Sequence, residues 1–392
     1  MITCPHCHFE NPDDARFCGR CGRPLVENET RQQHFDPAGQ QKKSTLLDSV
    51  NQFVGSDRPA DLNWRVLFSD VFRSHPAEEA EELFICGTKT TTPQPSEVMK
   101  GWPHPWLYSR VLLMFVATYV LLWLCVNAFG NTNALPGMIV MGSFAMPLAT
   151  LVLFVELNAW RNISFYQVVK VFFIGGCASL LATLFLFSFQ TAGMSEQMTY
   201  WEAFTVGFIE EVGKAVIVYL FLKKMSDRAN ILSGMVIGAS IGAGFAAFES
   251  AGYALQPLIN FCLSQGYALA HGQQLDPQIM LTAINRSVIA RGFLAPGGHV
   301  AWAALSGAGL VMAAKSSGHF SLGLLVDGKF LRLFLISFVL HGLWDSPLAG
   351  VINSIIPFAG YIALILTVWV VVLLIINMGL AEVSKAAKCS NQ

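Results

Sequence analysis

The sequence predicts an all-α polytopic membrane protein, with about eight transmembrane helices and a small cysteine-rich module at its N-terminus. Of the 392 residues, 53% are hydrophobic and only 13% are charged, whereas charged residues make up about a quarter of an ordinary soluble domain. The mean hydropathy is +0.49. This apolar composition makes a lipid bilayer the expected surrounding of the protein. The formal net charge of -1 gives no indication of nucleic-acid binding, so no nucleic-acid partner is expected.

The N-terminal module is defined by the cysteines Cys4, Cys7, Cys18 and Cys21, which form two CxxC pairs. Each CxxC turn points two thiolates at one ion, and two such turns close a tetrahedral sulfur shell around Zn2+. We therefore expect these four residues to bind a structural Zn2+; the alternative, disulfide pairing, requires an oxidising compartment. The pattern resembles the zinc-ribbon modules found at the N-termini of bacterial proteins. Such a closed site leaves no position for catalysis.

Composition divides the rest of the chain. A polar stretch predicts a flexible linker, and apolar residues at helical spacing between Leu62 and Phe84 predict a short amphipathic helix, with a second helix opening at His75. Trp106 and Tyr108 suit the level of the lipid headgroups. The predicted domains are 1–25, zinc ribbon; 26–61, flexible linker; 62–105, cytoplasmic juxtamembrane segment; 106–380, transmembrane domain; and 381–392, cytoplasmic tail.

Eight apolar runs are long enough to cross a bilayer. They lie at 111–129, 138–157, 168–189, 203–222, 231–253, 294–314, 331–350 and 355–379. Lys and Arg concentrate in the loops after the second, fourth and sixth runs, which places both termini in the cytoplasm. The longer loop from 254 to 292 is then external, and its segment 281–289 predicts an amphipathic helix on the membrane surface. Arg286 and Arg291 in this loop run against the charge rule.

The run from 203 to 222 contains three charged residues, Glu210, Glu211 and Lys214. Each charge near the centre of a bilayer costs roughly 2.5–3.5 kcal/mol on an insertion scale, so such residues usually face a bundle interior or a wet cavity. Lys214 is three residues from Glu211 and four from Glu210, and it can pair with either on one helical face. A structural ion pair is the simple alternative, but it leaves one of the two acids unexplained.

Further polar residues occur in three other runs: Glu249, His299, and the pair His341 and Asp345. Helices of alternating direction carry them at similar depths, nearer the outer face, given a rise of 1.5 Å per residue. Each alone has a structural interpretation, as a satisfied core histidine, a hydrogen-bonded pair or a helix bridge. Their common depth with the glutamates favours one functional cluster.

Successive helices thus carry Glu210-Glu211-x-x-Lys214, then Glu249, then His299, then His341-x-x-x-Asp345. In this order, these motifs resemble the PrsW family of intramembrane proteases, which is related to the CAAX prenyl endopeptidases. The first motif of the latter ends in Arg one residue later, so the chain is closer to the PrsW branch. The resemblance spans about 62–380 and implies a bacterial inner-membrane peptidase that makes a first cut in a membrane-anchored regulator such as an anti-sigma factor. The catalytic residues that it implies are Glu210, Glu211, Lys214, Glu249, His299, His341 and Asp345.

The residues allow two kinds of hydrolysis. In the first, Glu210 or Glu211 activates water and a histidine donates to the oxyanion. In the second, Glu249, His299, His341 and Asp345 hold a metal ion whose bound water attacks. No HExxH motif is present, so the sequence leaves the catalytic metal open.

Two other classes of protein compete with the peptidase. Buried acids and histidines also serve proton relays, so a proton-coupled transporter is one alternative; no inverted repeat of broken helices supports it. The other is a membrane scaffold that docks partners through its zinc ribbon, which leaves the costly buried charges unexplained.

Overall fold

The computed structural model describes residues 2–3, 10–11, 45–98, 101–190 and 198–390, and it divides into two units, Met1–Ser44 and Thr45–Gln392. In the first unit, β1 (Ile2–Thr3) pairs antiparallel with β2 (Glu10–Asn11). These strands bracket the first CxxC pair in sequence. Cys4, Cys7, Cys18 and Cys21 themselves lie outside the described residues, as does most of the predicted linker.

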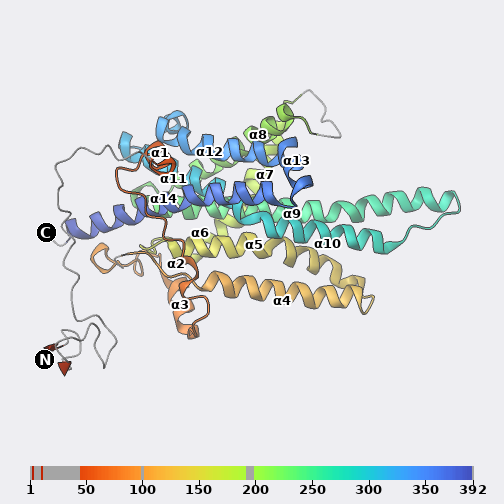
Figure 1. The fold of residues 1–392 in the computed structure, drawn as a ribbon, viewed down its shortest axis with the longest axis horizontal. Coiled ribbons are helices and arrows are strands. Elements are labelled where there is room, and N and C mark those ends of the chain that lie inside the picture. Colours follow the sequence, from red (N-terminus) through yellow and green to blue (C-terminus); the bar gives the residue numbers. More distant parts are fainter. Residues whose placement is uncertain (1, 4–9, 12–44, 99–100, 191–197, 391–392) are drawn as a thin grey trace. The chain divides into compact units, whose positions relative to one another are not determined.

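The described part of the second unit is helical (Figure 1). Its shorter helices before the bundle are α1 (Leu46–Phe53), α2 (Val66–Ser69), α3 (Ala77–Ile85) and the 3-10 turn η1 (Pro95–Glu97). The bundle follows: α4 (Leu107–Asn127), η2 (Thr132–Ala134), α5 (Leu135–Leu157), α6 (Phe165–Lys170), the π-helical turn η3 (Val171–Gly175), α7 (Gly176–Phe187), α8 (Tyr200–Lys223), η4 (Ser226–Arg228), α9 (Ile231–Ala270), α10 (Pro277–Leu294), η5 (Ala295–Gly297), α11 (His299–Ser317), η6 (Leu322–Val326), α12 (Gly328–Asp345), α13 (Pro347–Ile355) and α14 (Ala359–Ser390).

Six helical segments of the described chain are long and apolar enough to span a membrane, and the pair α12 and α13, bent by 58°, makes a seventh. This confirms an all-α, multi-pass membrane protein. All eight predicted runs are helical, but α8 is not among these seven segments. Its three buried charges, Glu210, Glu211 and Lys214, exclude it, because the other segments carry two charged residues or fewer over their apolar stretch. It packs against α7, α11 and α12.

Two expectations outside the spans were wrong. The predicted linker contains α1, which begins with a capping box of Thr45 and Asp48 and leads into the buried Val54. The two helices expected between Leu62 and Phe84 are present as α2 and α3. The break falls at 70–76, where the residue before Pro76 is disfavoured in helical conformation.

The second wrong expectation concerns the external loop from 254 to 292. The structure instead continues α9 to Ala270 and returns along α10, so the two form a long helical hairpin that extends past the other helices (Figure 1). Apolar residues of both arms bury against the start of α5: Val126, Leu135, Met138, Ile139, Ala254, Leu281, Ile284 and Val288. The helical spacing at 281–289 therefore marks a packed face and not one lying on a membrane surface.

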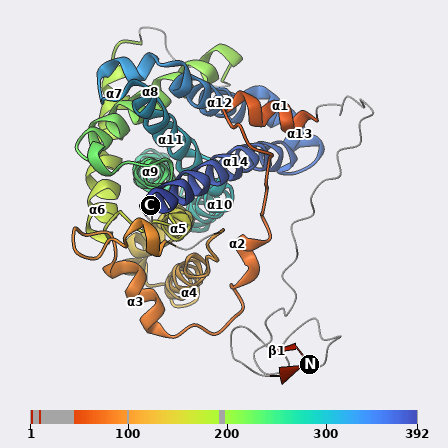
Figure 2. The ribbon, with the colours of Figure 1, turned by 90° about the vertical axis from the view of Figure 1, so that its left-hand side faces the viewer.

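Helix α9 lies at the centre of the bundle when viewed end-on (Figure 2), and it packs most extensively against α11. Glycines allow this approach. A Cβ atom at Gly234 or Gly238 would overlap the backbone of α11, and one at Gly242 would overlap the carbonyl oxygen of His299. Small residues let helix backbones approach closely in membranes. This contact sets His299 directly against α9.

We expect Gly238→Ala to destabilise the protein by about 1–3 kcal/mol, because the added methyl group overpacks the contact between α9 and α11. Gly252→Ala is the matched control, since nothing lies within 4 Å of a Cβ atom there; replacing this helical glycine should be neutral or stabilising. Thermal unfolding in detergent measures both. Equal destabilisation by the two substitutions would contradict the packing account.

Candidate active site

The innermost part of the site is a buried group of Glu211, Lys214 and His341. Glu211 and Lys214 are both 0% exposed. The Lys214 Nζ atom lies 2.6 Å from Glu211 Oε1, and His341 Nδ1 lies 2.8 Å from the same oxygen. A carboxylate oxygen only accepts, so Lys214 and His341 both donate to it. Glu211 therefore fixes the His341 ring so that its Nε2 atom points away from Glu211, toward Glu210 and Asp345.

The second glutamate, Glu210, lies one residue earlier on α8 and has different surroundings. Its Oε2 atom is 3.7 Å from His341 Nε2 and 3.9 Å from both His299 Nδ1 and Lys214 Nζ. These distances exceed those of hydrogen bonds, and Oε2 is buried without a hydrogen-bond partner. Of the two acids, Lys214 therefore pairs closely with Glu211 and leaves Glu210 facing the two imidazoles.

On the other side of the cluster, Glu249 and Arg291 hold His299. Glu249 Oε2 lies 3.1 Å from His299 Nε2 and also forms an ion pair with Arg291. Arg291 Nε donates to Ser250 Oγ at 3.0 Å, and its guanidinium lies over the ring of Tyr253, 4.2 Å from the centroid. Arg291 thus contacts three residues of α9 and fixes the carboxylate that accepts from His299.

Aromatic rings enclose these polar groups. Trp302 stacks on His341, with 4.5 Å between ring centroids and 23° between planes. Lys214 Nζ lies 4.6 Å from the centroid of Phe245, at cation–π distance. Asp345 completes the cluster, since its Oδ2 is 3.3 Å from His341 Nε2.

A cavity of about 300 Å³ opens beside the cluster. Its polar lining comes from α8 to α12: Glu210, Glu249, Ser250, Tyr253, Arg291, His299, His341 and Asp345. Glu211 and Lys214 do not line it. The groups that can meet a substrate or a water molecule are therefore distinct from the buried pair behind them.

The structure brings all seven sequence-predicted site residues into one cluster. One placement differs: Glu249 was expected near the outer end of its helix but lies near the middle of α9, because α9 continues to Ala270. Sequence reasoning missed Arg291 as a site residue. Its signal was present, since a cation that runs against the charge rule of the loops indicates a fixed acidic partner.

The described residues contain one group suited to a metal ion: Glu210, His299 and His341, with one ligand atom each within 4.8 Å of one another. The ligands of a tetrahedral zinc ion lie about 3.4 Å apart, given bonds of about 2.1 Å. The separations of 3.7 and 3.9 Å from Glu210 Oε2 are close to this value, and that oxygen has no hydrogen-bond partner.

The surroundings of the two imidazoles also fit a metal. His299 directs Nε2 at Glu249 and His341 directs Nδ1 at Glu211, which leaves the other nitrogen of each ring toward Glu210. A carboxylate behind each metal-bound histidine is the usual arrangement. The group suited to a metal ion thus differs from the set expected from the sequence, Glu249, His299, His341 and Asp345: it contains Glu210 with the two histidines, and Glu249 lies behind His299.

A bundle of apolar helices that brings carboxylates and imidazoles together at one cavity, with a buried lysine behind them, suits an intramembrane peptidase. Comparison with protein families agrees: the model of the PrsW family intramembrane metalloproteases matches residues 164–376, and a zinc-ribbon domain matches residues 3–25. The first match covers more than half of the chain, and the chain belongs to the PrsW family of intramembrane metalloproteases. No curated protein and no solved structure matches it.

Proposed function

We propose that the protein makes a first cut in a membrane-anchored regulatory protein, such as an anti-sigma factor, near the outer face of the bacterial inner membrane. The observation that carries this proposal is the convergence of Glu210, His299, His341 and Asp345 from three separate helices on one cavity. The alternation of charged loops supports cytoplasmic termini, and the zinc ribbon then lies in a reducing compartment.

Within this proposal, Glu210, His299 and His341 hold the catalytic metal ion. When bound, the ion would polarise the scissile carbonyl and lower the pKa of its water. Lys214 Nζ now lies 2.8 Å from His299 Nδ1, the nitrogen nearest Glu210, so the ammonium and a metal ion exclude each other there. Lys214 retains Glu211 as its partner in either state.

The remaining residues orient and transfer protons. Glu211 holds His341 and Glu249 holds His299 in one tautomer each. Asp345 lines the cavity, is not bound by the buried lysine, and accepts the proton of the attacking water before returning one to the leaving amine. Glu211 does not reach the cavity, and for this reason we no longer assign it as the base that activates water.

Comparative membrane proteomics tests the function. A strain carrying Glu210→Ala and Glu211→Ala should accumulate one uncut membrane protein that the wild type cleaves. A flux assay in proteoliposomes tests the competing class: proton-coupled transport that the same substitutions abolish, together with an unchanged membrane proteome, would overturn the peptidase proposal.

Removing metal should lower proteolysis at least about 100-fold, because the metal supplies several kcal/mol of transition-state stabilisation. The full chain with Cys4→Ser and Cys7→Ser removes the ribbon's ion as a complication: this variant should bind one equivalent of zinc and lose activity when it is stripped. Zinc should restore the activity. Full activity of a stripped sample, with metal analysis showing none, would contradict the metal assignment and leave a glutamate mechanism.

Replacing Arg291 should lower kcat about 10- to 100-fold with little change in KM, the usual effect of losing an outer partner of a metal ligand. Arg291→Gln breaks the ion pair to Glu249, whereas Arg291→Lys should recover part of the rate. Arg286→Gln, on the exposed side of the same helix, is the control. Equal losses for both glutamine variants would contradict a positioning role for Arg291.

A further inference from the structure

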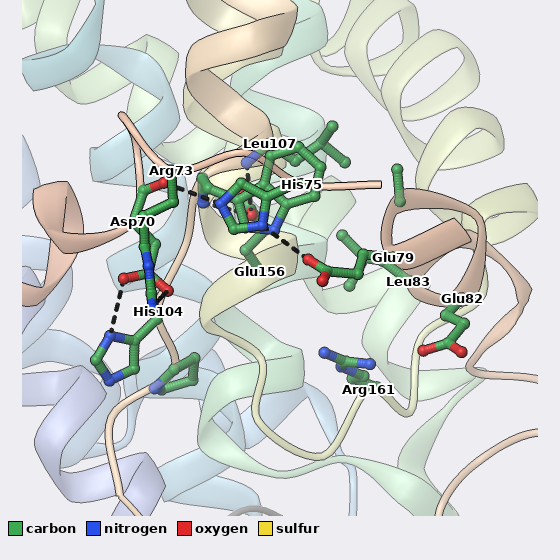
Figure 3. A pocket seen from close by; sticks show the side chains of 13 residues that line it. Asp70, Arg73, His75, Glu79, Glu82, Leu83, His104, Leu107, Glu156 and Arg161 are labelled. Atoms are coloured by element: carbon green, nitrogen blue, oxygen red, sulfur yellow. Dashed lines mark hydrogen bonds and ion pairs between the residues drawn. The ribbon is translucent and has the colours of Figure 1, made fainter. Parts of the chain in front are cut away.

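A second cavity, of about 410 Å³, lies where α3 and the segment before it meet the start of α4 and the end of α5. Figure 3 shows its side chains. The charged and polar lining residues are Asp70, Arg73, His75, Glu79, Glu82, His104, Glu156 and Arg161. None of them belongs to the candidate active site.

The floor of this cavity is rigidly built. Glu156 accepts hydrogen bonds from the backbone N–H groups of Trp106, Leu107 and Tyr108 at 2.7, 2.8 and 2.9 Å. These donors are orphans at the beginning of α4, so one carboxylate from α5 fixes the start of the first span. Trp106 and Tyr108 also place this floor at the headgroup level of a bilayer.

Most charges in the lining are already neutralised. The His75 ring stacks on Trp106, with 4.0 Å between centroids; its Nδ1 lies 2.7 Å from Glu79 Oε2 and its Nε2 lies 2.9 Å from the Asp70 carbonyl oxygen. Desolvation opposes protonation, but these acceptors outweigh it and raise the pKa of His75. Two acceptors require two donors, so His75 is a cation that pairs with Glu79, as Arg73 pairs with Asp70 at 3.2 Å.

Two lining charges remain without a hydrogen bond or ion pair from their side chains among the described residues: Arg161 and Glu82. Figure 3 shows both on the same side of the cavity. Arg161 has a φ of 49°, a left-handed conformation that costs free energy in residues other than glycine. Its N–H bonds to the Asn158 carbonyl oxygen at 2.8 Å, which holds the loop in this conformation. The open charges are thus one cation and one anion.

An apolar groove of about 240 Å³ adjoins the cavity, and Leu83 lines both. Its walls come from α3, α5, α6 and η3, and include Phe84, Val152, Val169 and Phe173. A ligand that fills both spaces has a headgroup with both charges and an apolar chain.

We propose that this site binds a zwitterionic, amine-bearing phospholipid of the phosphatidylethanolamine class, with its phosphate at Arg161, its ammonium at Glu82 and an acyl chain in the groove beyond Leu83. An anionic phospholipid lacks the ammonium and leaves Glu82 unmatched beside the other acids. A free phosphate or phosphoethanolamine lacks the chain that fills the groove. The two opposite charges of the cavity and the adjoining apolar groove together favour the zwitterionic lipid over either alternative.

Native mass spectrometry of the full-length protein from nanodiscs tests the proposal. With dioleoyl phosphatidylethanolamine, the wild type should retain one lipid, and Arg161→Gln should weaken its retention about tenfold or more, as expected for losing charge-assisted hydrogen bonds. Arg65→Gln is the matched control, because Arg65 contacts Trp64 outside this cavity. The wild type and Arg161→Gln should both retain phosphatidylglycerol weakly and to a similar extent. Free phosphoethanolamine should not displace the bound phosphatidylethanolamine.

Val169→Trp keeps the proposal testable if Arg161→Gln disturbs the fold. Val169 lines the groove and is 36% exposed, so a tryptophan there would fill part of the groove. This variant should leave thermal unfolding unchanged and should reduce phosphatidylethanolamine retention. Equal retention of both lipids by the wild type, equal loss in Arg161→Gln and Arg65→Gln, or displacement by free phosphoethanolamine would each overturn the site.

Discussion

Replacing Glu210 by Gln should lower kcat/KM for proteolysis by about 10²- to 10⁴-fold, the range that positioned acid–base groups and metal ligands supply. The substitution keeps the size of the side chain and removes its charge. Glu210 is the carboxylate whose Oε2 faces both His299 and His341 without a hydrogen bond. An amide there neither holds a metal ion well nor takes up a proton, so the loss follows in either mechanism.

The matched control lies on the same helix. Glu202→Gln affects a half-buried residue of the capping box at the start of α8, outside the cavity, and glutamine is also accepted at that position. Cleavage of a membrane-anchored reporter in proteoliposomes compares the two variants. A Glu210→Gln enzyme with more than a tenth of the wild-type rate would remove Glu210 from the reaction.

Charge within apolar sequence made the site predictable. Glu210, Glu211, Lys214, Glu249 and His299 are each improbable in a membrane span, and the bilayer's cost for burying them leaves convergence as the simplest solution. Which acid pairs with Lys214 was not predictable, because helical spacing allows both. The choice depends on α12, whose His341 approaches Glu211 from another helix.

The α9–α10 hairpin shows where sequence reasoning failed. The segment after 253 is only moderately apolar and carries Pro257 inside the helix, so hydropathy indicated a loop. Its helical conformation depends on tertiary packing of Ala254 and Leu281 against α5, and helices in proteins owe most of their stability to such packing. Because the loop was misassigned, Arg291 was not placed beside Glu249.

The buried pair of Glu211 and Lys214 should have the largest effect on stability. Glu211→Gln leaves the Lys214 ammonium, 0% exposed, without its carboxylate, and breaking a buried pair in this way costs about 3–5 kcal/mol. Lys214→Met should cost a similar amount, because it leaves the Glu211 carboxylate with His341 alone. In each case the penalty comes from an uncompensated charge in a medium where water cannot solvate it.

The double variant Glu211→Gln/Lys214→Met should therefore recover much of the loss, with a coupling energy of about 2–3 kcal/mol between the two sites. Glutamine still accepts from His341 Nδ1, and methionine still packs on Phe245, so the cluster keeps its shape without charge. Equilibrium unfolding of the four proteins in mixed micelles measures this cycle. Strictly additive losses would show that Glu211 and Lys214 do not compensate each other, and the interpretation of Glu211 as the support behind Glu210 would then be wrong.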